Sequence, residues 1–193
     1  MTHADSMETK IRQMLDFLRG TEQLKSTLRS GYTAQGRPES TAEHSWRLCL
    51  MAMLFAGEYP GVDHYRVLKM CVIHDLGEAL HGDIPAIYQD PTVNKAVEER
   101  EHLLVLLAPL PADMQAELLA LWDEYNAAAT PEARLAKAFD KLETVLQHTQ
   151  GLNPPDFDYA FNLGYARQYT DYDALTRAVR ALIDAETARL AGL

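Results

Sequence analysis

The chain has 193 residues, of which 47% are hydrophobic and 24% are charged, as is usual for a globular protein that buries a sizeable core. It carries 28 acidic and 18 basic residues, which gives a formal net charge of −10. This balance argues against a sequence-independent nucleic-acid binder, which needs a basic surface. It is compatible with a small phosphorylated substrate, because one metal ion and one or two basic residues can neutralise such a ligand locally.

No segment predicts a membrane anchor or a second domain. The first ten residues, MTHADSMETK, are polar and lack the apolar core of a signal peptide. No apolar run approaches the roughly 20 residues that span a bilayer. Repeats and low-complexity linkers are absent, so we expect one domain over residues 1–193. The two cysteines, Cys49 and Cys71, lie in apolar helical runs without the spacing of a zinc or redox motif, which fits core packing and a reduced cytoplasmic setting.

Apolar residues at helical spacing predict helical structure over residues 8–28, divided into two short helices near Gly20. Arg29 follows the second helix, where a cation either complements the helix dipole or contacts a phosphate. Residues 30–40 are rich in Gly, Pro and Ser and predict a loop that carries Tyr32.

A helix start is predicted at Ser40, because Ser40 and Glu43 have the spacing of a capping box. The apolar pattern continues this helix to about Phe55. His44 therefore lies in its first turn, where the helix dipole disfavours the protonated ring. We expect His44 to be either a neutral metal ligand or a partly exposed histidine.

The stretch Val67–Pro85, VLKMCVIHDLGEALHGDIP, holds several ionisable residues in a row after an apolar run. The run has no polar face and predicts a buried helix that ends at the glycine before Asp83. His74 and Asp75 follow the run directly, and Glu78 lies one turn further on. Residues adjacent in a helix point about 100° apart, so His74 and Asp75 can share an ion between them. The alternative is a buried His–Asp hydrogen bond.

The rest of the chain also predicts helices, and no segment shows the alternation of a strand. Thr130 and Pro131 are typical of a helix N-terminus. In the helix that follows, Asp140 interrupts the apolar stripe and either faces a site or pairs with a neighbouring lysine. The fold is therefore predicted to be all-α. The expected segments are an irregular stretch at 83–91, helices at about 92–108, 111–122, 131–150 and 172–190, and a Pro- and Asp-rich loop at 151–158.

Four polar residues on three helices can thus form one site: His44, His74, Asp75 and Asp140. Two imidazoles and two carboxylates suit a divalent transition metal ion such as Mn, Fe, Co, Ni or Zn. The spacing of three sequence blocks also resembles a known family: RPESTAEHSWR, VIHDLGEALHGDIPA and KAFDKLE. They resemble the HD-domain superfamily of metal-dependent phosphohydrolases, and most closely its small single-domain branch of 5′-deoxynucleotidases.

The resemblance implies a compact multi-helix bundle that hydrolyses nucleoside 5′-monophosphates to nucleoside and phosphate. It implies that the four residues hold one metal ion, and that Glu78 and Asp83 orient or deprotonate the attacking water and assist the leaving group. The counterparts of the family's substrate-binding arginine and tryptophan are Arg29 and Tyr32. A homodimer is also implied. Tyrosine in place of tryptophan leaves the choice between ribose and deoxyribose open.

Three other interpretations remain. A dinuclear HD-domain oxygenase needs further histidines, and the chain offers only His81 and His102 before Asp140, with His81 too close to the His-Asp pair. The same fold and metal could act on a nucleoside triphosphate or another phosphate ester. A helical scaffold with a degenerate site is the third, and the complete set of expected ligands argues against it.

Overall fold

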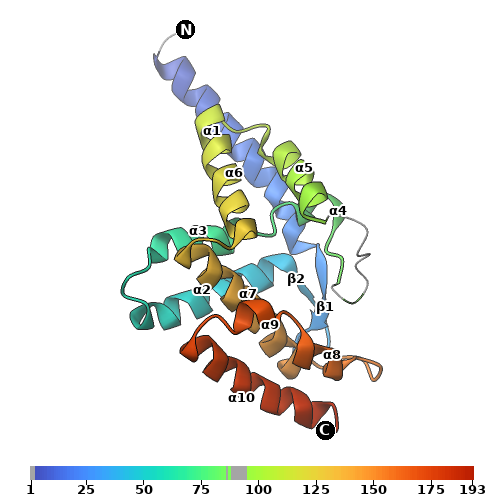
Figure 1. Cartoon of the computed structure of the whole chain (residues 1–193). Coiled ribbons are helices and arrows are strands. Elements are labelled where there is room, and N and C mark those ends of the chain that lie inside the picture. Colours follow the sequence, from blue (N-terminus) through green and yellow to red (C-terminus); the bar gives the residue numbers. More distant parts are fainter. Residues whose placement is uncertain (1–2, 86, 88–94) are drawn as a thin grey trace.

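Helices form most of the chain in the computed structural model, which describes residues 3–85, 87 and 95–193 (Figure 1). Among these residues, none of the helices combines the length and apolar character needed to cross a bilayer. The all-α expectation is confirmed, with a small two-stranded sheet in addition. The α-helices are α1 (His3–Thr21), α2 (Thr41–Phe55), α3 (His64–Ile73), α4 (Glu78–His81), α5 (Lys95–Leu107), α6 (Ala112–Ala127), α7 (Pro131–Gln150), α8 (Tyr159–Gly164), α9 (Arg167–Thr170) and α10 (Ala174–Leu190).

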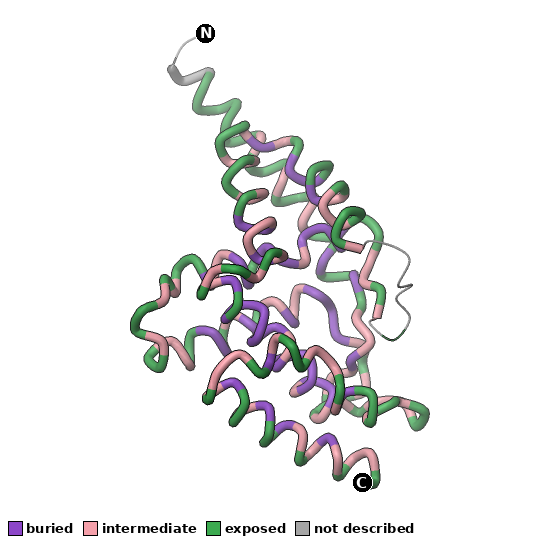
Figure 2. The backbone as a smooth tube through the Cα atoms, viewed as in Figure 1, coloured by how far each residue is buried: buried purple, intermediate pink, exposed green. Residues whose placement is uncertain are grey.

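Helix α7 is the centre of the fold and packs against α2, α3, α6, α9 and α10. It begins as expected: the side chain of Thr130 accepts a hydrogen bond from the backbone N–H of Ala133, and Pro131 occupies the first turn. Leu135, Phe139 and Leu142 are buried on it. Figure 2 shows the buried residues gathered where these helices meet. Several polar residues of α7, among them Asp140 and Glu143, are therefore buried inside the molecule.

The segment before α2 differs from the prediction. Only a four-residue 3₁₀ helix, η1 (Glu22–Lys25), follows α1, and strands β1 (Leu28–Tyr32) and β2 (Pro38–Ser40) replace the expected helix end and loop. The strands are antiparallel. Gln147 of α7 donates a hydrogen bond to the carbonyl oxygen of Tyr32 at 2.6 Å. This tertiary contact stabilises a strand whose residues, LRSGY, show no alternation of polar and apolar side chains.

The predicted continuous helix through Glu78 is also wrong. Helix α3 ends at Ile73, residues 74–77 form a turn, and α4 begins at Glu78. A Cβ atom at Gly77 would lie only 2.5 Å from the carbonyl oxygen of Glu99, so the turn packs against α5 more closely than any side chain allows. As predicted, a glycine ends α4: Gly82 has φ +85°.

The other predicted helix and loop boundaries agree in part with those of the structure. The capping box of Ser40 and Glu43 is present at the start of α2. Helix α6 continues five residues beyond the expected end at Trp122, to Ala127. Helices α8 and α9 were not predicted. Of the irregular segment expected at 83–91, only residues 83–85 and 87 are described, and residues 92–94 of the following helix lie outside the described part.

Candidate metal centre and substrate cavity

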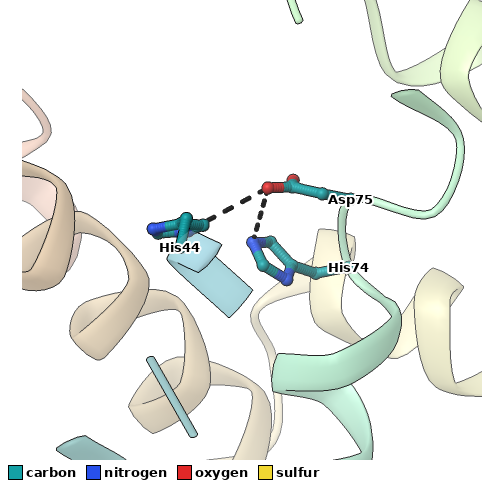
Figure 3. Close-up of side chains that lie close together, drawn as sticks. All are labelled: His44, His74 and Asp75. Carbon is teal, nitrogen blue, oxygen red and sulfur yellow. Dashed lines mark ion pairs between the residues drawn. The ribbon is translucent and has the colours of Figure 1, made fainter. Parts of the chain in front are cut away.

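Three elements bring together the four residues predicted to hold a metal ion. His44 comes from the first turn of α2, His74 and Asp75 from the turn after α3, and Asp140 from the middle of α7. Oδ2 of Asp75 lies 3.0 Å from Nε2 of His74 and 4.0 Å from Nε2 of His44 (Figure 3). Oδ1 of Asp140 lies 3.1 Å and 3.8 Å from Nε2 of His44 and His74, respectively. His44, His74 and Asp75 each offer a ligand atom within 4.8 Å of the other two, and Asp140 faces both histidines.

The ring of His74 is oriented for ligation. Its Nδ1 donates a hydrogen bond to the carbonyl oxygen of Cys71 at 3.0 Å, so Nε2 carries the lone pair. Nε2 is buried and has no hydrogen-bond partner among the described residues. A buried lone pair that faces two carboxylate oxygens is satisfied by a cation. The donor set therefore fits a divalent metal ion.

His44 is oriented by groups behind it that sequence reasoning missed. Its Nδ1 donates to Oε2 of Glu143, and Oε1 of Glu143 accepts a hydrogen bond from Arg47 at 2.6 Å. Burial and Arg29 lower the pKa of His44, but Glu143 and Asp140 outweigh them and raise it to about 9. In the metal-free site the two carboxylates thus outweigh the helix dipole, and the alternative of a partly exposed histidine is wrong, because His44 is fully buried. A ligated ion would displace that proton.

The sequence left open whether Asp140 faces a site or pairs with a lysine, and in the structure it does both. Oδ1 faces the two histidines, whereas Oδ2 contacts Nζ of Lys141 at 2.7 Å and accepts a hydrogen bond from the hydroxyl of Tyr125. Burial opposes ionisation, but Lys141 and the histidines hold the pKa of Asp140 well below its usual range. The carboxylate is thus ionised and positioned by two partners on its far side.

Glu78 and Asp83 lie close to this group. Oε2 of Glu78 accepts a hydrogen bond from Thr41 at 3.2 Å. Nζ of Lys95 lies 3.5 Å from Oε1 of Glu78 and 3.9 Å from Oδ1 of Asp83. Burial and the charges of Asp75 and Asp83 raise the pKa of Glu78 to about 9. The two acids thus form a second cluster around one lysine, beside the metal ligands.

Arg29 reaches the same site from β1. Its Nη1 lies 3.3 Å from Oδ2 of Asp75, and its Nη2 donates to the hydroxyl of Thr144 at 3.1 Å. Burial lowers the pKa of Arg29, but Asp75 and the other acids of the site raise it well above its usual value. Tyr32, three residues along the strand, lines the same cavity. Both residues predicted to bind substrate are therefore placed at the site.

A cavity of about 470 Å³ joins these groups, a size suited to a small-molecule ligand. Its lining includes the metal-facing carboxylates of Asp75 and Asp140 together with Arg29 and Lys141. Aromatic side chains from the segment after α7 lie along its wall. The wall residues from the C-terminal third are His148, Pro154, Asp156, Phe157, Asp158, Phe161, Asn162 and Tyr165.

Sequence reasoning missed several of these residues for different reasons. Glu143 follows Asp140 by three residues, within the block KAFDKLE, but an acid on a helix resembles a surface residue. Lys141 is one of the lysines near Asp140 that the sequence offers as its ion-pair partner, and nothing in the sequence places it in a cavity. Lys95 and the aromatic wall give no local signal, because only the packing of α5 and α8 brings them to the cavity.

Comparison with known proteins agrees with this geometry. The sequence model of the HD domain matches residues 21–180. The chain belongs to the HD-domain family. A solved structure, that of a predicted metal-dependent phosphohydrolase from Magnetospirillum magnetotacticum MS-1, superposes with a TM-score of 0.75 at 31% identity, over 94% of this chain and 97% of that chain.

Two further relatives carry a more specific name. The 5′-deoxynucleotidase HDDC2 of Bos taurus is 34% identical over 141 residues, which cover 72% of this chain and 68% of the relative. The 5′-deoxynucleotidase hdd1 of Schizosaccharomyces pombe is 35% identical over 144 residues, which cover 72% of each chain.

The dinuclear alternative needs further histidine ligands at the HD-domain site. His81 and His102 instead stack on each other, with ring centroids 3.8 Å apart. Among the described residues, no cluster of three or more metal-binding side chains includes either of them. In the part of the chain that the structure describes, neither of these two histidines is therefore placed to hold a second ion beside the first.

Proposed function

We propose that this HD-domain protein hydrolyses nucleoside 5′-monophosphates to nucleoside and inorganic phosphate. The observation that carries the proposal is a cavity of about 470 Å³ that joins a two-histidine, two-carboxylate group to a buried arginine. Relatives at 34% and 35% identity are named 5′-deoxynucleotidases, which supports a nucleotide as the substrate.

We propose that His44, His74, Asp75 and Asp140 hold one divalent ion. Mn, Fe, Co, Ni and Zn all suit this ligand set. The unpartnered Nε2 of His74 supports the assignment. When bound, such an ion lowers the pKa of a bound water molecule and offsets the charge of a phosphate oxygen.

Glu78 and Asp83 are the proposed proton-transfer groups. A carboxylate acts as a base when it removes a proton from water and as an acid when it protonates the leaving oxygen. Both side chains line the cavity. Thr41 and Lys95 hold Glu78 in place through contacts of 3.2 Å and 3.5 Å. One of the two acids would orient or deprotonate the attacking water, and the other would assist departure of the nucleoside.

The proposed phosphate-binding groups are Arg29 and Lys141. Both are cationic, and both line the cavity next to Asp75 and Asp140. A guanidinium binds two phosphate oxygens at once, and an ammonium adds a point charge. Tyr32, three residues further along β1 and also on the cavity wall, would offer its ring to the sugar.

The test is phosphate release from a panel of ribo- and deoxyribonucleoside 5′-monophosphates. The protein is stripped of metal with a chelator, and Mn, Co or Zn is added back singly. We expect release that depends on added metal, and the ribo/deoxy ratio reports the effect of Tyr32. Absence of release with every metal would refute the monophosphatase assignment. Nucleoside triphosphates in the same panel test the alternative substrate class.

We further propose a homodimeric, cytoplasmic protein. Helix α1 carries a stripe of exposed apolar side chains: Met7, Ile11, Met14, Leu15 and Leu18. Exposed apolar stripes of this kind are typical of interfaces. Light scattering after gel filtration tests the dimer.

The proposed cytoplasmic location is supported by the free thiols of Cys49 and Cys71, which fit a reducing compartment.

A further inference from the structure

The side chain of Asn162 holds an unused hydrogen-bond donor at the wall of the cavity. Asn162 lies on α8 and is only 2% exposed. Its Nδ2 is buried and has no hydrogen-bond partner among the described residues, although the residue lines the cavity wall. A buried amide N–H without a partner is destabilising, because it has lost its hydrogen bonds to water and gained none in return. Such an unpaired donor therefore either lowers the stability of the fold without a benefit or forms its hydrogen bond with a bound ligand.

The orientation of the amide is fixed by His148. Nδ1 of His148 lies 3.1 Å from Oδ1 of Asn162. Burial lowers the pKa of His148 to about 4, so the ring is neutral at pH 7 and carries one proton. With that proton on Nδ1, the ring donates to Oδ1, and Nδ2 of Asn162 is left free. The imidazole ring of His148 packs edge-to-face against the ring of Phe157, with the two ring centroids 5.0 Å apart.

The backbone of α8 is fixed by a second buried residue. Arg180 of α10 is fully buried and donates hydrogen bonds to the carbonyl oxygens of Asn162 and Tyr165. Its Nε donates to Asp184 at 2.7 Å. Helices α8 and α10 pack together (Figure 1). Asn162 is therefore held from both its main chain and its side chain.

Asn162 lines the cavity beside His148, which is displaced along α7 from the proposed phosphate site. Its partner His148 lies two turns along α7 from Asp140, about 12 Å at the rise of an α-helix. Thr144, which contacts Arg29, lies between them. The wall around Asn162 is aromatic and includes Phe157, Phe161 and Tyr165. Aromatic rings are stacking surfaces for nucleobases of any sequence.

We propose that Asn162, His148 and the aromatic wall form a nucleobase subsite, in which Nδ2 of Asn162 donates a hydrogen bond to a carbonyl oxygen of the base. This inference rests on the proposed function and adds the group that recognises the base. A site built to donate to a carbonyl disfavours a base that lacks one, because its buried donor then stays unpaired. Uracil, thymine, cytosine and guanine each have a carbonyl oxygen, whereas adenine has none.

The test compares Asn162→Asp and Asn162→Leu with the wild type. Both are close to asparagine in size and remove the donor, and Asp keeps an oxygen for His148. We expect kcat/KM for dUMP, dCMP and dGMP to fall between about fivefold and 100-fold. The values for dAMP and for 2-deoxyribose 5-phosphate, which lacks a base, should stay within about twofold. Thermal unfolding checks that each variant is folded.

Calorimetric titration of the metal-stripped proteins with dUMP and dAMP gives a readout that needs no turnover. We expect the Kd for dUMP to rise about tenfold in both variants and the Kd for dAMP to be unchanged. If dUMP binds in this way but no monophosphate is hydrolysed with any metal, the proposed function fails and the subsite stands. Equal losses for dUMP, dAMP and 2-deoxyribose 5-phosphate, or no loss for any of them, would overturn the subsite. Absence of dUMP binding by the wild type would overturn it as well.

Discussion

Glu143 lies directly behind His44 and accepts a hydrogen bond from Nδ1 of its ring. The contact directs Nε2 of His44 toward Asp140, 3.1 Å away. Arg47 donates to the other oxygen of Glu143 at 2.6 Å. A carboxylate behind a ligating imidazole fixes the ring and increases its basicity. Glu143 is thus expected to govern metal affinity without binding the ion itself.

The first prediction is that Glu143→Gln weakens metal binding by about 10–100-fold. Glutamine keeps an oxygen that can accept from His44 but loses the negative charge. The measurement is calorimetric titration of the metal-stripped protein with Mn or Co. Glu186→Gln is the control, because Glu186 is an exposed carboxylate on α10 paired with Arg189. An unchanged affinity in Glu143→Gln would show that the contact only packs the ring.

The second prediction concerns Glu78. Glu78→Gln should retain the metal ion and lose turnover by about 10²–10⁴-fold, because an amide cannot transfer the proton that a carboxyl group transfers. Metal content after dialysis and kcat on a deoxynucleoside monophosphate are the two readouts. Asp83→Asn, made in parallel, separates the contributions of the two acids. Unchanged activity in Glu78→Gln would remove Glu78 from the proposed chemistry.

Features determined by residues near one another in the chain could be predicted from the sequence. Ser40 and Glu43 cap α2, and Thr130 begins α7, because these hydrogen bonds form within a single turn. The metal-facing residues could be recognised for a related reason. His74 and Asp75 interrupt apolar sequence, where an ionisable side chain is unfavourable unless something pairs with it.

Features determined by packing between distant segments could not be predicted. Strand β1 pairs with β2 and is held to α7 through the backbone of Tyr32, whereas its own residues show no alternation of polar and apolar side chains. Lys95 reaches Glu78 only through the packing of α4 on α5. The role of Asn162 depends on a missing partner, which no sequence pattern reveals.

The third prediction is a packing test at Gly77. A Cβ at this position would meet the carbonyl oxygen of Glu99 at 2.5 Å, whereas a Cβ at Gly57 would meet nothing within 4 Å. Gly77→Ala should lower the free energy of unfolding by about 1–3 kcal/mol, since backbone must move to admit the methyl group. Gly57→Ala is the matched control and should change it little. Urea denaturation measures both, and equal stabilities would contradict the close approach of the turn to α5.

The fourth prediction is a pH dependence from His148. Burial and the charge of Arg29 lower its pKa from 6.5 to about 4 in the folded protein. Between these values the unfolded chain binds a proton that the folded chain does not, so the free energy of unfolding falls as the pH falls. From pH 7 to pH 5 the wild type should lose about 2 kcal/mol more than His148→Gln. Urea denaturation at both pH values checks this, and parallel losses would contradict the low pKa.

The last prediction separates two roles of Arg29. Its guanidinium contacts Asp75 at 3.3 Å and Thr144 at 3.1 Å, so it could bind the phosphate or only neutralise the carboxylate. Arg29→Lys keeps the charge but loses the planar fork that binds two oxygens. We expect KM for a nucleoside monophosphate to rise about tenfold, with metal affinity retained. Arg189→Lys, at an exposed pair with Glu186, is the control. An unchanged KM together with altered metal affinity would mean that Arg29 serves Asp75 and that Lys141 carries the phosphate contact.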